Sequence, residues 1–176
     1  MLEMMLTRIL KKPNEPGVFK KLLASDGAAK DYFGNSVAVS SDGSTIVVGA
    51  NGDDDKGTDS GSVYIFTKQA NGSYLQIQKL VASDGAANDY FGWSVDVSAD
   101  GSTVVVGAFG DADKGTDSGS AYIFTKQVNG SYLQVQKLVA SDGVAGDYFG
   151  YSVAISNTSV AVGAYNHLTK GAVYVY

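Results

Sequence analysis

Two acidic segments contain the residues of this chain best suited to binding a metal ion. Both have the spacing D-x-D-x-G-x-D: Asp53, Asp55 and Asp59 in the first segment, and Asp111, Asp113 and Asp117 in the second. Calcium prefers several oxygen ligands, and alternate aspartates around a glycine turn can surround one ion. Lys56 and Lys114 lie inside the segments, which also lack the closing glutamate of an EF-hand. A calcium site is therefore one prediction; the other, which these features favour, is a solvated turn whose aspartates cap backbone N–H groups.

Composition argues against most catalytic chemistry. The chain has 176 residues, no cysteine and a single histidine, His167, so thiolate chemistry is excluded and a histidine-based triad or zinc site has almost no ligands to draw on. The net charge of −5 argues against a nucleic-acid surface. No segment approaches the ~20 apolar residues of a membrane-spanning helix. We therefore expect a non-catalytic protein with no nucleic-acid partner and no membrane span.

An internal repeat organises the sequence and positions the acidic segments. Residues 21–78 and 79–136 align without a gap, and 47 of their 58 positions are identical. A third, shorter unit covers residues 137–176. Each unit therefore corresponds to one supersecondary structure that packs on its neighbours.

Each complete unit contains four segments with the pattern of short strands. In the first unit these span residues 33–40, 45–50, 62–67 and 73–78, and the acidic segment connects the second to the third. Asp42-Gly43 and Asn71-Gly72 are favoured hairpin turns because glycine accepts positive φ. The second segment is apolar on both faces, as in a strand between two layers. Four antiparallel strands per repeat predict an all-β fold built of β-propeller blades.

Paired aromatic and small residues recur at the same places in all three units. They are Phe33-Gly34 with Gly49-Ala50, Phe91-Gly92 with Gly107-Ala108, and Phe149-Gly150 with Gly163-Ala164. These pairs resemble FG-GAP repeats, which build the seven-bladed propeller of integrin α subunits and occur in bacterial and algal surface proteins. The resemblance covers roughly residues 18–176. It implies an extracellular or cell-surface module for adhesion or ligand binding. Many family members bind calcium between their first two strands, but here that place holds only a short turn such as Asp42-Gly43, so that site is not carried over.

Four aromatic residues stand where the otherwise similar repeats differ. Trp93 and Tyr151 occupy the position of Asn35, and Phe109 and Tyr165 occupy the position of Asn51. Such changes among near-identical repeats predict a ligand-binding face, with drift between the repeats as the alternative. The ligand, a protein or a glycan, is not specified by the sequence.

The ends of the repeat array differ from its middle. Residues 1–15 form a leader with helical spacing of apolar residues and no signal-peptide pattern, and residues 16–176 form the repeat domain. The third unit has no fourth-strand segment of its own, whereas residues 17–20 align with the end of a fourth strand. We therefore expect the N-terminal segment to complete the last blade, within one chain or between two chains. Since closed propellers have ~4–8 blades, three blades predict a homo-oligomer or further repeats of a longer chain. A purely structural spacer is the alternative function.

Overall fold

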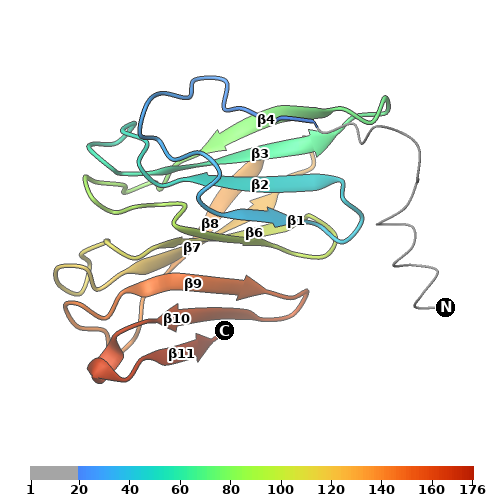
Figure 1. The fold of residues 1–176 in the computed structure, drawn as a ribbon. Helices are drawn as coiled ribbons and strands as arrows, with labels where there is room; N and C mark the ends of the chain where they lie inside the picture. Colours follow the sequence, from blue (N-terminus) through green and yellow to red (C-terminus); the bar gives the residue numbers. More distant parts are fainter. Residues whose placement is uncertain (1–19) are drawn as a thin grey trace, which may run out of the picture.

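A computed structural model describes residues 20–176 and contains three antiparallel β-sheets, one for each repeat (Figure 1). The predicted leader helix and the predicted strand residues 17–19 lie outside the described residues. The strands are β1 (Val37–Val39), β2 (Thr45–Ala50), β3 (Ser62–Lys68) and β4 (Tyr74–Leu80) in the first sheet; β5 (Ser94–Val97), β6 (Thr103–Ala108), β7 (Ser120–Lys126) and β8 (Tyr132–Leu138) in the second; and β9 (Phe149–Ile155), β10 (Val160–Ala164) and β11 (Ala172–Val175) in the third.

Strand order within each sheet follows the sequence. The sheets have the orders β1-β2-β3-β4, β5-β6-β7-β8 and β9-β10-β11, with every neighbouring pair antiparallel. This meander, repeated along the chain, confirms the predicted propeller blades. Among the described residues, β11 pairs only with β10, so the third sheet has three strands.

The first strands of the first two sheets start later than the sequence pattern predicts, whereas β9 of the third sheet begins at Phe149 itself. β1 begins at Val37 and β5 at Ser94, because the Tyr-Phe-Gly segments before them form turns. Tyr32 and Gly34 both have positive φ, as do Tyr90 and Gly92. Left-handed backbone interrupts regular strand pairing: glycine adopts it without steric cost, and tyrosine adopts it only when its surroundings impose it. In the third sheet, β9 contains Gly150 with positive φ, and its pairing with β10 shifts register there.

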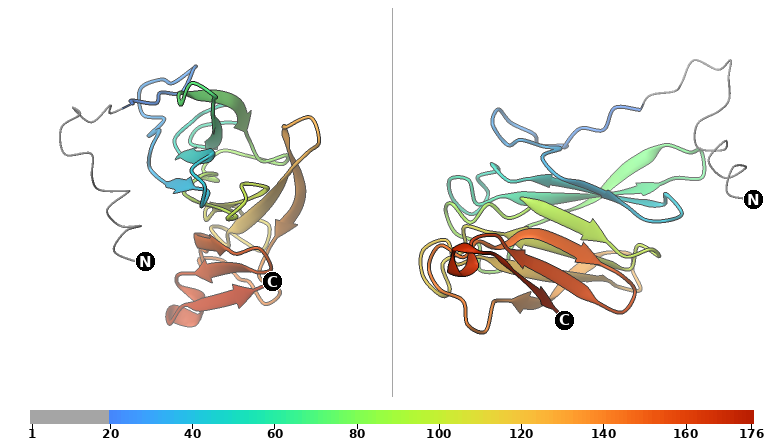
Figure 2. Two further views of the ribbon diagram at one scale, coloured as in Figure 1. Left: turned by 90° about the vertical axis from the view of Figure 1, so that its right-hand side faces the viewer. Right: turned by 60° about the horizontal axis from the view of Figure 1, so that its bottom comes forward.

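The apolar core lies between successive sheets, which stand side by side with the second between the first and third (Figure 2). Val63 and Ile65 of β3 belong to one buried cluster with Val95 and Val97 of β5. Phe91 is fully buried in the same cluster and meets Tyr122 edge-on, with ring centroids 5.4 Å apart. Burial of β2 and β6 on both faces confirms that these strands lie inside the layers.

Candidate functional site

An ammonium group lies at the centre of the first acidic segment. Lys79 Nζ, at the end of β4, is 2.9 Å from Asp26 Oδ2, 2.9 Å from Asp53 Oδ2 and 2.7 Å from Asp55 Oδ2. The Tyr64 hydroxyl lies 2.9 Å from Asp26 Oδ1 and 3.0 Å from Asp53 Oδ2. The Lys79 ammonium group therefore neutralises Asp53 and Asp55, two of the carboxylates that the sequence pattern predicted as calcium ligands.

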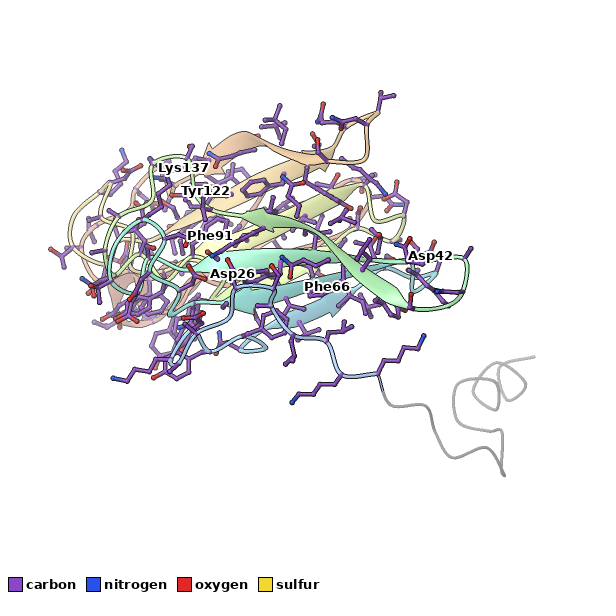
Figure 3. All side chains as sticks on the ribbon, turned by 90° about the horizontal axis from the view of Figure 1, so that it is seen from above. Asp26, Asp42, Phe66, Phe91, Tyr122 and Lys137 are labelled. Carbon is purple, nitrogen blue, oxygen red and sulfur yellow. The ribbon has the colours of Figure 1, made fainter. Side chains whose placement is uncertain are left out.

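The second repeat reproduces this ion cluster. Lys137 Nζ lies 2.7 Å from Asp84 Oδ2, 2.8 Å from Asp111 Oδ2 and 2.7 Å from Asp113 Oδ2. One carboxylate oxygen from each aspartate lies within 4.8 Å of the other two. Tyr122 and Lys137 are neighbours in Figure 3, with Nζ 5.4 Å from the ring centroid. The arrangement is a tyrosine-supported lysine bridge between three carboxylates.

The pKa shifts show which charges the bridge stabilises. Burial alone would raise the pKa of Asp53, but hydrogen bonds from Lys79, from the Asp55 N–H and from Tyr64 outweigh burial and lower it. Burial would likewise lower the pKa of Lys79, whereas its bonds to Asp55, Asp53 and Asp26 raise it. Both partners are therefore held in their charged forms at neutral pH.

The structure brings together only part of the predicted calcium set. Asp53 and Asp55 share Lys79, and Asp111 and Asp113 share Lys137. Asp59 and Asp117 instead use their backbone carbonyls to accept hydrogen bonds from Tyr90 and Tyr148 of the following sheet. The sequence reasoning missed the contributing residues outside the loops, which are Asp26, Tyr64 and Lys79 in the first cluster and Asp84, Tyr122 and Lys137 in the second. Their identity in both repeats is the signal that could have found them.

The third repeat contains a histidine at the corresponding place. His167 begins the 3-10 helix η1 (His167–Thr169) and follows Ala164 at the same distance as Asp111 follows Ala108. Its Nδ1 lies 2.9 Å from Asp147 Oδ2, and its Nε2 lies 3.6 Å from Asp142 Oδ2. Tyr174 donates a 2.7 Å hydrogen bond to Asp142 Oδ1. His167 thus stands at the position of Asp53 and Asp111 in the other two repeats.

We expect His167 to make stability depend on pH. The hydrogen bond with Asp147, followed by the charges of Asp147 and Asp142, raises its pKa above 6.5 against the effect of burial. A raised folded-state pKa stabilises the fold fully below pH 6.5, and this contribution is lost as pH rises through the folded-state pKa. The difference in melting temperature between wild type and His167→Gln should therefore shrink as pH is raised from 5.5 to 8.5. A constant difference would contradict this assignment.

The four variable aromatic residues form one continuous cluster, together with two repeated tyrosines. Trp93 meets Phe109 at 4.7 Å between ring centroids and Tyr151 at 5.5 Å. Tyr151 stacks on Tyr165 at 5.0 Å with the rings inclined by 27°. Tyr90 stacks on Phe109 at 5.0 Å, and Tyr148 lies between Phe109 and Tyr165. We call this set, Tyr90, Trp93, Phe109, Tyr148, Tyr151 and Tyr165, the aromatic cluster.

The aromatic cluster joins the second and third blades and opens to solvent at one end. Trp93 and Phe109 are partly buried, whereas Tyr151 is 38% exposed and Tyr165 is 67% exposed. These two tyrosines line a shallow hollow that also includes Ser152 and Lys170. The buried members fix the positions of the exposed rings, and the hollow adds hydrogen-bonding groups beside them.

The repeated antiparallel sheets and their inter-sheet cores define a β-propeller-type repeat protein. The family model for the FG-GAP repeat matches residues 17–66, 74–124 and 132–176, and the chain belongs to this family. The search of curated proteins gave no match.

Similar solved structures agree on the fold. Sqt1 of Saccharomyces cerevisiae has a TM-score of 0.50 and 12% sequence identity over 82% of this chain and 31% of that one. Hydrazine synthase of Kuenenia stuttgartiensis has a TM-score of 0.50 and 16% identity over 80% of this chain and 32% of that one. The chain thus spans about a third of the length of either structure, and at such identities the likeness concerns the fold alone. Among residues 20–176, no helix has the length and hydrophobicity needed to cross a membrane.

Proposed function

We propose that the protein is a non-catalytic binding module, located outside the cell or at its surface, and that its ligand contacts the exposed end of the aromatic cluster. The observation that carries this proposal is the convergence of the four variable aromatic residues, from two different repeats, on one surface. The location and the adhesive role are supported by the resemblance of the repeats to those of integrin α subunits and of bacterial and algal surface proteins.

The chemistry of the surface favours a ligand with a flat apolar face and polar edges. Tyrosine and tryptophan offer rigid apolar area at a small entropic cost, and they are enriched among the residues that dominate binding energies. Tyr151 and Tyr165 present such area to solvent beside Lys170. A sugar ring or an aromatic or proline-rich protein segment has this combination of features.

The non-catalytic assignment rests on how the polar side chains are used. The lysine and aspartate groups of the two ion clusters bind one another, and the raised pKa values of Lys79 and Lys137 show that both lysines stay charged. His167 is directed at Asp147 and Asp142. An acid or base poised for proton transfer at neutral pH needs a pKa near 7 and access to a substrate, whereas the clustered lysines have raised pKa values.

Replacing the two exposed tyrosines tests the proposed function. We expect the Tyr151→Ala/Tyr165→Ala variant to lose at least about tenfold in affinity for a ligand found on glycan and matrix-protein arrays. Leu133→Ala is the matched control, since Leu133 is 58% exposed on β8 outside the aromatic cluster. Unchanged binding by the tyrosine variant would place the ligand elsewhere. A folded wild-type protein that binds nothing on either array would favour the spacer function.

A further inference from the structure

The interface between blades repeats within the chain, and its two halves have distinct apolar residues. At the first interface, Val63 and Ile65 of β3 are completely buried. They share a cluster with Val95 and Val97 of β5, which are 9% and 6% exposed. The second interface, between the second and third sheets, is built in the same way from β7 and β9.

The two outer sheets each expose one half of this same interface. On the third sheet, Val173 and Val175 flank Tyr174 as Val63 and Ile65 flank Tyr64, yet they are 70% and 71% exposed. On the first sheet, Val37 and Val39 hold the positions of Val95 and Val97 and are 60% and 58% exposed. Each exposed face is therefore complementary, by the chain's own repeat, to the face at the opposite end.

One side-chain hydrogen bond also crosses each interface at the same position of the repeat. Ser36 Oγ donates to Gly92 O at 2.7 Å, and Ser94 Oγ donates to Gly150 O at 2.8 Å. In the repeat, Ser152 is the next donor and Gly34 is the preceding acceptor. One face thus offers the hydroxyl and the other offers the carbonyl that this bond requires.

Within the part of the chain that the structure describes, the third ion cluster has no counterpart of the lysine that the fourth strand supplies in the first two. Lys79 and Lys137 each precede the last leucine of that strand and bind Asp26 and Asp84. The equivalent Asp142 is 62% exposed and, among residues 20–176, has an ion pair only with His167. Lys21 precedes Leu22 in the same sequence context, K-L-x-A-S-D-G. Lys21 therefore matches the lysine that would complete the third cluster.

The N-terminal segment is already placed for contact with a blade preceding the first sheet. Ser25 N donates to Gln76 Oε1, as Ser83 N donates to Gln134 Oε1 where β4 leads into the second blade. Leu22 packs against the outer core of the first sheet, beside Tyr64 and Phe66. The third sheet of the same chain lies on the opposite side of the second (Figure 2).

We propose that two copies of this chain associate head to tail and complete each other's third blade. The face with Val173 and Val175 packs on the partner copy's face with Val37 and Val39. Residues 20–22 of each copy pair beside β11 of the other, where Lys21 binds Asp142. Both halves of the contact are present on every copy, which favours a second copy over an unrelated protein. Two contacts of this kind close a pair of chains with six blades, within the ~4–8 of closed propellers.

Light scattering after size-exclusion chromatography tests the association. Wild type should elute with the mass of two chains, and Val175→Glu should lose the dimer by weakening association on the order of 100-fold, because the carboxylate would be buried without a partner. Val128→Glu, at a fully exposed hairpin position, is the control and should remain dimeric. Since Val175 is exposed in the single chain, circular dichroism should show both variants folded. A monomeric wild type, or a dimeric Val175→Glu, would overturn the proposal.

A charge exchange shows whether the strand crosses between copies. Lys21→Glu and Asp142→Lys should each be monomeric, because each places like charges together at both contacts. Mixed in equal amounts, the two variants should recover the dimer, since every contact then pairs a lysine with an acid. Folding of each variant is again checked by circular dichroism. Failure of the mixture to dimerise would overturn the exchange between copies.

Discussion

Replacing Gly107 by alanine should destabilise the protein by more than about 3 kcal/mol, the upper range for a side chain forced into a packed site. A Cβ atom at Gly107 would overlap the carbonyl oxygen of Gly150 in the next blade and the hydroxyl of Ser94. The serine hydroxyl can rotate, but the carbonyl belongs to backbone and cannot move alone. The two blades would therefore have to separate, which exposes the core that contains Val105, Phe149 and Val162.

Thermal and urea unfolding of Gly107→Ala measure this effect, with Gly130→Ala as the control. Gly130 has a φ of +87° and no neighbouring atom within 4 Å of an added Cβ. It reports the cost of left-handed backbone alone, about 1–2 kcal/mol. Gly107 has no such backbone requirement, so its loss of stability reports the inter-blade contact. Equal losses for the two variants would contradict this explanation.

The same contact explains why the recurring Phe-Gly and Gly-Ala pairs predicted the fold so well. Gly49 meets the backbone of Gly92 as Gly107 meets that of Gly150, and each following phenylalanine, Phe91 or Phe149, is fully buried. Motif, repeat and strand alternation are local features of a sequence. They determine one blade and its packing on the next, so the all-β blade architecture could be predicted without coordinates.

The ion clusters could not be predicted in the same way because their members are far apart in sequence. Asp26 and Lys79 meet only when β4 pairs with β3 in a register that sets Lys79 opposite Tyr64. A bulge between Ile65 and Phe66 shifts that register, so strand alternation alone does not give the direction of Lys79. The predicted fourth strand ended at residue 78, and β4 continues to Leu80. The acidic loop was visible in the sequence, but the lysine that bridges it was not.

The aromatic cluster could be predicted from the sequence only in part. Variation among the repeats singled out Trp93, Phe109, Tyr151 and Tyr165, but their contact depends on the angle between two blades. Trp93 immediately precedes β5 of the second blade and Tyr151 lies in β9 of the third, and their rings meet at 5.5 Å. Tyr90 and Tyr148 are identical among the repeats, so variation between the repeats does not single them out. The repeat comparison thus identified the variable members, while packing between blades defined the cluster.

Lys137→Met should lower stability by about 2 kcal/mol, or roughly 4–8 °C in melting temperature for a chain of this size. The variant keeps the length and apolar stem of lysine but leaves Asp84, Asp111 and Asp113 without their shared cation. The Asp111 side chain is only 5% exposed, whereas those of Asp84 and Asp113 are about half exposed, at 47% and 50%. Solvent therefore reduces the loss below that of a fully buried ion pair. Lys114→Met is the control, because Lys114 lies in the same acidic segment but is exposed; it should change stability by less than about 0.5 kcal/mol.

Adding calcium to the same variants tests whether the acidic segment binds calcium or the lysine ammonium group. In wild type, a calcium ion would have to displace Lys137 Nζ from three carboxylate oxygens at 2.7–2.8 Å. We expect millimolar calcium to leave the melting temperature of wild type and Lys114→Met unchanged. In Lys137→Met the three carboxylates would repel one another, so calcium should recover part of the lost stability by binding the folded state. A ligand raises the melting temperature only if it binds the folded chain more tightly than the unfolded chain. Calorimetric heat and a rise in melting temperature for wild type would therefore show that calcium displaces the lysine and that the acidic segment is a metal site.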